Sequence, residues 1–195
     1  MQLNSINNQG HSKKLDLVVS IVVYNSDLEI LSNLCEKVLS SSLNLKLVLL
    51  DNSEVNYAYH FNNYKHDKRF SYIKTKKNKG FGAGHNIVIK EYANISKYLL
   101  FLNPDIVMND RVLETLFKRM ELNEKIGLCI PKILNVDGTI QYVNKKLPQP
   151  FDLIFRRIRF FSKYGPSIVQ KLMKSYELRD MYDFNAFLCP YISGC

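Results

Sequence analysis

The segment Leu17–Val23, LVVSIVV, is an almost unbroken run of apolar residues, most of them β-branched. A strand with one face in water alternates apolar and polar residues, whereas an unbroken apolar run indicates a strand that is buried on both faces. Such strands occupy the middle of parallel sheets that helices cover on both sides. The segment therefore predicts a central strand of a parallel sheet and restricts the fold to the α/β class.

Strands and helices are predicted to alternate from Leu15 to about residue 130. Apolar runs predict further strands at residues 45–50, 70–75, 98–102 and 126–130. Between them, apolar residues recur at helical intervals after Ser26, over residues 86–93 and after Asp110. Ser26 and Glu29 have the spacing of a capping box, and Asp110 is a candidate N-cap. This alternation predicts a mostly parallel sheet with helices on both faces.

The pattern changes after Pro131. Asp137 and Gly138 stand between two short apolar segments and predict a hairpin turn. Residues 145–179 are rich in lysine and arginine. We therefore divide the chain into a loose polar tail at residues 1–14, an α/β region at residues 15–132 and a basic, aromatic-rich region at residues 133–195.

The formal charge of +9, from 27 Lys+Arg against 18 Asp+Glu, favours an anionic partner. Phosphate groups, nucleic acid and an acidic membrane surface all meet this condition, so charge alone does not choose among them. The four cysteines lack the spacing of a zinc site, which fits reduced thiols in the cytoplasm. The polar N-terminal tail lacks the apolar core of a secretion signal, and no apolar run reaches the ~20 residues that span a bilayer.

Polar clusters follow four of the predicted strands. They are Asn25, Asp51-Asn52-Ser53, the glycine-rich segment from Asn78 to Asn86, and Asn103-Pro104-Asp105. For each cluster taken alone, a turn is the alternative explanation. Because the carboxyl ends of parallel strands meet at one edge, where ligands of α/β sheets bind, we expect the clusters to converge on one site.

The glycine-rich segment KNKGFGAGHN carries Gly80, Gly82 and Gly84 beside lysines. It does not match the dinucleotide fingerprint, because His85 occupies the position of the third glycine, and it is not a P-loop. What remains is a backbone that a ligand can approach closely, leading into a helix whose free amides favour anions. The alternative is a plain glycine turn that tightens the packing of strand and helix, with His85 as a polar packing residue.

Asp105 is a candidate metal ligand. Mg²⁺ and Mn²⁺ are typically held by one or two carboxylates while substrate phosphates supply other oxygens. Asp105 follows a predicted buried strand, and Pro104 stiffens the turn. The alternative for this tripeptide is an ordinary turn with a capping role.

Four motifs together resemble the family 2 glycosyltransferases, specifically the rhamnosyltransferase-like branch of bacterial surface-polysaccharide synthesis. The motifs are Val19–Asn25 (VSIVVYN), Asp51–Ser53 (DNS), Asn78–Asn86 (NKGFGAGHN) and Leu100–Asp105 (LFLNPD). Their order and spacing agree over residues 15–132. A weaker likeness resumes at residues 191–195, YISGC, which resemble the family's serine-glycine segment.

The resemblance implies a GT-A fold, Rossmann-like, and a nucleotide-diphosphate sugar as donor. Tyr24 and Asp51 would then line the base pocket, and Asn103-Pro104-Asp105 would replace the family's Asp-x-Asp, with Asp105 on a divalent metal, Mg²⁺ or Mn²⁺. The residues expected to bind the nucleotide sugar are Tyr24, Asn25, Asp51, Asn52, Asn78, Gly80, Gly82, Asn86, Asn103 and Asp105.

The resemblance also implies that the catalytic base lies beyond Cys195, so we expect a chain truncated at its C-terminus and assign no base within it. Asp180 and Asp183 have no matching context. The implied reaction is transfer of a sugar, plausibly rhamnose, to a lipid-linked glycan at the inner face of the cell membrane. The segment Phe151–Phe161 could contact that membrane, or could pack its phenylalanines on the sheet.

Two alternatives stay open. The chain could be a non-catalytic nucleotide-binding remnant of such an enzyme, or a nucleic-acid binder that uses its basic stretch. No recognised nucleic-acid-binding motif supports the second alternative, so we expect no nucleic-acid partner.

Overall fold

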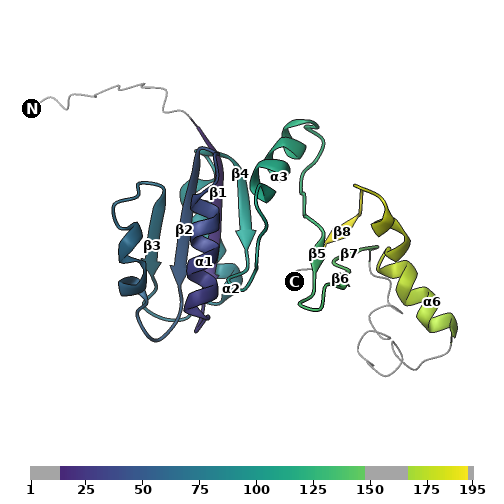
Figure 1. The fold of residues 1–195 in the computed structure, drawn as a ribbon, viewed down its shortest axis with the longest axis horizontal. Helices are drawn as coiled ribbons and strands as arrows, with labels where there is room; N and C mark the ends of the chain where they lie inside the picture. Colours follow the sequence, from purple (N-terminus) through teal and green to yellow (C-terminus); the bar gives the residue numbers. More distant parts are fainter. Residues whose placement is uncertain (1–13, 148–166, 193–195) are drawn as a thin grey trace, which may run out of the picture. The chain divides into compact units, whose positions relative to one another are not determined.

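The structure is a computed structural model that describes residues 14–147 and 167–192. The chain divides into two compact units, Met1–Ile130 and Pro131–Cys195, which are described separately (Figure 1). The elements of the first unit are β1 (Leu15–Val23), α1 (Leu28–Leu39), β2 (Leu45–Asp51), the 3₁₀ helix η1 (Ala58–Tyr64), β3 (Phe70–Lys74), α2 (Phe81–Tyr92), β4 (Ser96–Leu102) and α3 (Val112–Glu121).

The first unit is built on a parallel sheet with the strand order β3-β2-β1-β4. β1 lies between β2 and β4, and residues 17–23 are buried, as the apolar run predicts. The expected α/β class is confirmed. A further strand at residues 126–130 was expected and is wrong, because these residues pair with no strand in the described part of the chain and Leu128 is 68% exposed.

Helices cover both faces of the sheet. Ile21 of β1 and Leu34 of α1 belong to the larger apolar cluster, together with Leu113 of α3. Val18 of β1 and Val88 of α2 form the cluster on the opposite face. The alternate side chains of β1 therefore pack against α1 and α3 on one face and against α2 on the other. Figure 1 shows α1 and α2 on opposite faces of the sheet.

The helix starts differ from the sequence expectations. Asp27, not Ser26, caps α1, because its carboxylate accepts hydrogen bonds from the amides of Glu29 and Ile30 at 2.9 and 3.1 Å. At α3 the residue before the helix is Arg111, in a left-handed conformation with φ of 60°, and Asp110 makes no cap. The Asp110 carboxylate instead forms an ion pair with Lys37 of α1.

Helix α2 begins at Phe81, five residues before the expected start at Asn86. Gly80 has φ of 82° and ψ of 167°, a conformation open almost only to glycine, which turns the chain into the helix. The amide of Gly84 then closes the first helical turn on the carbonyl of Gly80 at 3.1 Å. The glycine-rich segment is therefore a short connection followed by a helix, rather than one long loop.

The second unit contains short elements. β5 (Ile133–Leu134) and β6 (Ile140–Gln141) form the expected hairpin around Asp137-Gly138, with Gly138 at φ of 80°. β7 (Asn144–Lys145) pairs with β8 (Tyr191–Ile192), and α6 (Ser167–Tyr176) precedes the 3₁₀ helix η2 (Arg179–Asp183). Tyr182 is buried, contacts the Tyr142 ring and accepts a hydrogen bond from the Asn144 amide.

The segment Phe151–Phe161, for which membrane contact was weighed, lies outside the described residues, as do most of the N-terminal tail and Cys195. None of the helices in the described part of the chain has the length and apolar character needed to cross a membrane.

Candidate functional site

The carboxyl ends of β1, β2 and β3 are tied together by main-chain hydrogen bonds. The amide of Asn52 donates to the carbonyl of Val23, and the amide of Thr75 donates to the carbonyl of Asp51, both at 2.9 Å. The amide of Asn25 also donates to the hydroxyl of Ser53 at 2.8 Å. Two of the predicted polar clusters thus meet at one edge of the sheet, together with the end of β3.

A pocket of about 290 Å³ opens at this edge. Its lining residues are Tyr24, Asn52, Ser53, Glu54, Lys74, Thr75, Lys76, Lys77 and Asn78. Tyr24, Asn52 and Asn78 are the predicted site residues among them. Glu54, Lys74 and Thr75 were not predicted, since no local motif marks them. Their place at the strand ends was the available signal.

Asp51 lies beneath the pocket rather than in its wall. Its side chain is fully buried, the Oδ1 atom accepts the amide of Ser53 at 2.8 Å, and the Oδ2 atom accepts the hydroxyl of Tyr72. Burial alone would raise the pKa of Asp51, but the hydrogen bonds from Tyr72, Ser53 and Lys74 outweigh it and lower the pKa. Asp51 is therefore an ionised anchor that does not line the pocket, and the contact with a base that the resemblance implies for it stays a prediction.

Lys74 is the cation that compensates Asp51. Its ammonium lies 3.3 Å from the Oδ2 atom of Asp51 and donates to the carbonyls of Ser53 and Val55. An ammonium group has three protons to donate, so these partners use its full capacity. Lys74 therefore holds the turn after β2 and has no donor left for a ligand.

Asn52 connects the turn after β2 with the start of α2. Its Oδ1 atom accepts the Thr75 hydroxyl at 2.9 Å and lies 3.5 Å from the amide of Lys79, while its amide group donates to the Gly80 carbonyl at 3.3 Å. Only 3% of Asn52 is exposed. The side chain thus spans the connection between β3 and α2 from end to end.

Tyr24 and Asn25 lie at the end of β1. Tyr24 is 49% exposed and lines the pocket, which suits an aromatic surface for a base. Asn25 has φ of 50°, a left-handed conformation that asparagine tolerates better than most residues. Asn25 makes its contact through the main chain, since its amide binds Ser53.

Of the predicted residues near the start of α2, Asn78 lies in the turn before the helix and lines the pocket, whereas Gly82 and Asn86 lie within the helix. The Asn78 side chain accepts the Gly80 amide at 2.7 Å and so stabilises the turn into the helix. Gly82 and Asn86 lie within α2, are exposed and do not line the pocket. They lie in a helix rather than in the expected loop, because the helix begins at Phe81, and their contact with a nucleotide sugar stays a prediction.

His85 is a packing residue in the structure, as the alternative interpretation of the glycine-rich segment holds. It is 5% exposed, its Nδ1 atom is hydrogen-bonded to the Ser20 hydroxyl at 2.7 Å, and its ring lies between Phe81 and Phe101. Burial lowers the pKa of His85, so the ring is neutral near pH 7. Its Nε2 atom is buried without a hydrogen-bond partner among the described residues.

Asn103 and Asp105 follow β4, which pairs in parallel with β1. They therefore lie at the same edge of the sheet as the pocket, although neither lines it. Asp105 is exposed within the Pro104-Asp105 turn, and its carboxylate has no hydrogen bond or ion pair within the described part of the chain. The carboxylate oxygens of Asp105 are thus accessible to a ligand at the edge of the candidate site.

The sequence profile described as Glycosyl transferase family 2 matches residues 18–188. This chain belongs to glycosyl transferase family 2. The match extends past residues 15–132, over which the four motifs agree in order and spacing, and reaches η2 and the residues that follow it. No curated protein matches the chain.

Solved structures confirm the GT-A-like fold of this family 2 chain. The crystal structure of S. aureus TarS 1–349 has 14% identity and a TM-score of 0.50, over 68% of this chain and 42% of TarS 1–349. The same protein in complex with UDP-GlcNAc also has 14% identity and a TM-score of 0.50, over 64% of this chain and 42% of its own. The family 2 chain thus spans less than half of the solved structures it resembles.

The residues at the edge of the sheet fit a divalent metal only in part. Within residues 14–147 and 167–192, no group of three or more His, Cys, Asp or Glu side chains is placed to hold a metal ion. One exposed carboxylate, Asp105, fits a hard cation whose other ligands are water and substrate phosphate oxygens.

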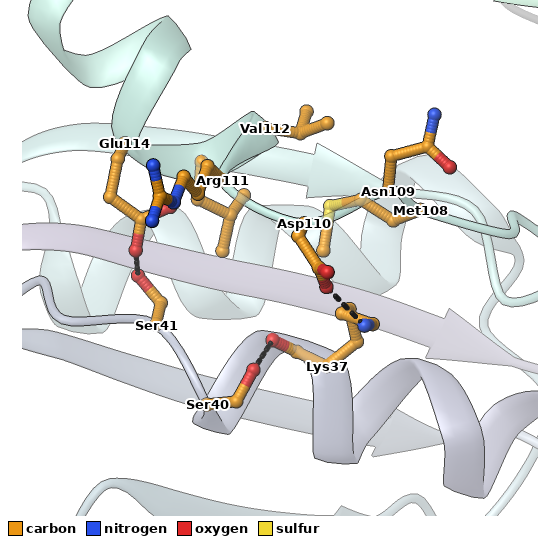
Figure 2. A pocket seen from close by; sticks show the side chains of 10 residues that line it. Lys37, Ser40, Ser41, Met108, Asn109, Asp110, Arg111, Val112 and Glu114 are labelled. Carbon is orange, nitrogen blue, oxygen red and sulfur yellow. Dashed lines mark hydrogen bonds and ion pairs between the residues drawn. The ribbon is translucent and has the colours of Figure 1, made fainter.

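A second pocket, of about 250 Å³, lies between the C-terminal end of α1 and the start of α3 (Figure 2). Lys37 pairs with Asp110 across it at 2.5 Å, and the Glu114 carboxylate accepts the Ser41 hydroxyl at 2.6 Å and the Ser42 amide at 3.0 Å. α1 runs back from the site edge, so this pocket lies toward the amino ends of the strands. Two pairs, Lys37 with Asp110 and Ser41 with Glu114, join α1 and the turn after it to α3, which indicates an anchor for α3.

Proposed function

We propose that this chain is the donor-binding part of a glycosyltransferase that uses a nucleotide-diphosphate sugar. Membership of family 2 supports the reaction class. The observation that carries the proposal is the pocket of about 290 Å³ at the carboxyl ends of β1, β2 and β3, which joins an exposed tyrosine to lysines. Open α/β sheets bind nucleotides at this edge.

The proposed donor lies along this edge with its base against Tyr24. Asp51 and Asn52 shape the pocket from beneath, through Ser53, Lys74 and Thr75. Asp105 would hold a divalent cation, Mg²⁺ or Mn²⁺, beside the diphosphate. When bound, that cation stabilises negative charge on the departing diphosphate.

In the proposed reaction an acceptor hydroxyl oxygen forms a bond to the anomeric carbon of the sugar. The bond from that carbon to the diphosphate oxygen breaks, with inversion, and the diphosphate leaves with the bonding electrons. A base must take the hydroxyl proton. Asp180 and Asp183 are exposed in η2, and nothing in their surroundings favours either as that base.

We further propose rhamnose as the sugar and a lipid-linked glycan of surface-polysaccharide synthesis as the acceptor, at the cytoplasmic face of the membrane. The four sequence motifs that resemble the rhamnosyltransferase-like branch support this choice. Thymidine diphosphate is therefore the first nucleotide to test. Uridine diphosphate is the second, because TarS was crystallised with UDP-GlcNAc.

The decisive experiment is calorimetric titration of the chain with thymidine, uridine and guanosine diphosphates, with and without Mn²⁺. We expect one nucleotide to bind and Mn²⁺ to tighten its binding. The Asp105→Ala variant should lose the effect of Mn²⁺. Asp110→Ala, which removes another exposed carboxylate of the same connection, is the matched control. Equal affinity in Asp105→Ala and the parent, both with Mn²⁺, would remove Asp105 from the site.

The two rival functions give different results. A non-catalytic remnant would bind the nucleotide but release no sugar from the matching nucleotide sugar, with or without an acceptor. A nucleic-acid binder would bind oligonucleotides with a steep dependence on salt, and would do so equally in Asp105→Ala.

A further inference from the structure

Residues 75–79, in the connection between β3 and α2, carry the positive charge of the pocket that has no partner among the described residues. We call this segment, Thr75-Lys76-Lys77-Asn78-Lys79, the lysine segment. Lys76 and Lys77 line the pocket and are exposed. Neither ammonium group has a hydrogen bond or an ion pair with any described residue, whereas Lys74 is fully engaged by Asp51, Ser53 and Val55.

The main chain of the lysine segment is held in place at both ends. The amide and the hydroxyl of Thr75 contact the carbonyl of Asp51 at 2.9 and 3.1 Å. The Asn52 side chain accepts a hydrogen bond from the Thr75 hydroxyl and donates one to the carbonyl of Gly80, the residue before α2. Two exposed lysines on a fixed main chain form a prepared site for an anion, because only their side chains must be ordered on binding.

We infer that Lys76 and Lys77 bind the phosphates of the nucleotide, with Asn52 as the positioning residue of the lysine segment. The inference rests on the proposed function and names residues that contact the donor. Ammonium groups bind phosphate as point charges through strong, charge-assisted hydrogen bonds. Asn52 acts through the segment, since its own side chain is buried and engaged.

The arrangement of the sheet lets the lysine segment and Asp105 act on one diphosphate. The lysine segment follows β3 and Asp105 follows β4, with β2 and β1 between them. Three strand spacings separate their main chains by roughly 14 Å. The diphosphate occupies the middle of a nucleotide sugar, so long lysine side chains can reach it from one side while Asp105 with a metal acts from the other.

The test compares Lys76→Ala/Lys77→Ala with Lys65→Ala/Lys68→Ala, which removes two exposed lysines near the opposite edge of the sheet. The affinities of the preferred nucleoside, its monophosphate and its diphosphate are measured at low and at high salt. In the parent, we expect the diphosphate to bind more tightly than the nucleoside. The ratio of these two affinities is called the gain from phosphate. Lys76→Ala/Lys77→Ala should reduce that gain at least about tenfold and flatten its dependence on salt.

The control variant should keep the parent's gain. An unchanged gain from phosphate in Lys76→Ala/Lys77→Ala would overturn the assignment of the two lysines. Equal losses in both double variants would overturn it as well, because they would show a general effect of net charge.

Thr75→Val and Thr75→Ser test the positioning role of Asn52, because Val removes and Ser keeps the hydroxyl that Asn52 accepts. We expect Thr75→Val to reduce the gain from phosphate and Thr75→Ser to retain it. A role in stability alone would lower the melting temperature and leave the ratio of diphosphate to nucleoside affinity unchanged. That result in Thr75→Val would overturn the positioning role.

Titration with inorganic pyrophosphate separates this inference from the proposed function. If the parent binds no nucleoside diphosphate, the proposed function fails. Pyrophosphate binding that weakens in Lys76→Ala/Lys77→Ala would then still support an anion site at the lysine segment. Absent binding, or binding equal in the parent and this variant, would overturn the inference.

Discussion

The hydroxyl of Tyr72 on β3 donates a hydrogen bond to the carboxylate of Asp51, whose side chain is fully buried at the end of β2. The same hydroxyl accepts the amide of Tyr57 at 3.1 Å, and so links the sheet to the connection that precedes β3. Burial raises the pKa of Tyr72, and the Asp51 carboxylate raises it further, so the phenol keeps its proton. The buried residue beneath the candidate pocket is thus a charged carboxylate whose hydrogen-bond partners are fixed.

Tyr72→Phe should reduce the free energy of unfolding at pH 7 by about 1–3 kcal/mol, because it leaves a buried carboxylate one donor short. Urea unfolding followed by circular dichroism measures the change. Tyr64→Phe is the control, since the Tyr64 ring packs on Phe70 as the Tyr72 ring packs on Phe61, and no hydrogen bond of the Tyr64 hydroxyl is seen among the described residues. Equal losses in the two variants would show that the Asp51 contact contributes nothing specific.

The same variant should shift the response to acid. The pKa of Asp51 is lowered below 3.8 in the folded chain, so its contribution to stability is present above pH 3.8 and is lost as the pH falls through the folded-state pKa. Without the Tyr72 hydroxyl the folded-state pKa rises. Acid unfolding of Tyr72→Phe should therefore begin at a higher pH than that of the parent, and coincident acid transitions would contradict this account.

His85 should make stability depend on pH in a higher range. Burial lowers its pKa below 6.5, so below that pH the unfolded chain binds a proton that the folded chain resists. Stability should fall as the pH drops from 7.5 to about 5.5. His85→Gln should show a flatter profile over this range, and a slope equal to the parent's would contradict this account.

Gly84 of α2 packs closely against the sheet. A Cβ atom added there would lie 2.8 and 2.9 Å from the two methyl groups of Val22. Gly84→Ala should lower the free energy of unfolding by about 1–3 kcal/mol, since Val22 is itself packed and cannot move away. Gly82→Ala is the matched control on the same helix, because a Cβ atom there meets nothing within 4 Å. Thermal unfolding of both variants distinguishes crowding from a general effect of alanine in α2.

Glu114 and Asp110 should differ in their contributions to the anchoring of α3. Glu114 accepts hydrogen bonds from the Ser41 hydroxyl and the Ser42 amide, whereas the Asp110 side chain is 81% exposed and pairs with Lys37 alone. Glu114→Ala should lower the free energy of unfolding by about 1–2 kcal/mol. Asp110→Ala should have a smaller effect that disappears in high salt. A larger loss in Asp110→Ala would reverse this ranking.

The prediction of the sheet was correct where the burial of an apolar run is enough to specify a strand. Residues 17–23 are apolar throughout, and only a strand covered on both faces buries such a run. The run at residues 126–130 gave the same signal but forms no strand, because a strand also requires a neighbour with which to share hydrogen bonds. Local sequence does not specify that neighbour.

The sequence by itself determined the α/β class, the hairpin at Asp137-Gly138 and the family, because apolar periodicity, turn chemistry and motif order are all local properties of the chain. Only the tertiary structure decided what each polar residue does. Asp51 and Lys74 form an ion pair with each other, whereas Lys76 and Lys77 line the pocket and their charges have no partner among the described residues. That division depends on contacts between strands that are distant in sequence, and residue type alone cannot reveal which charges are already compensated.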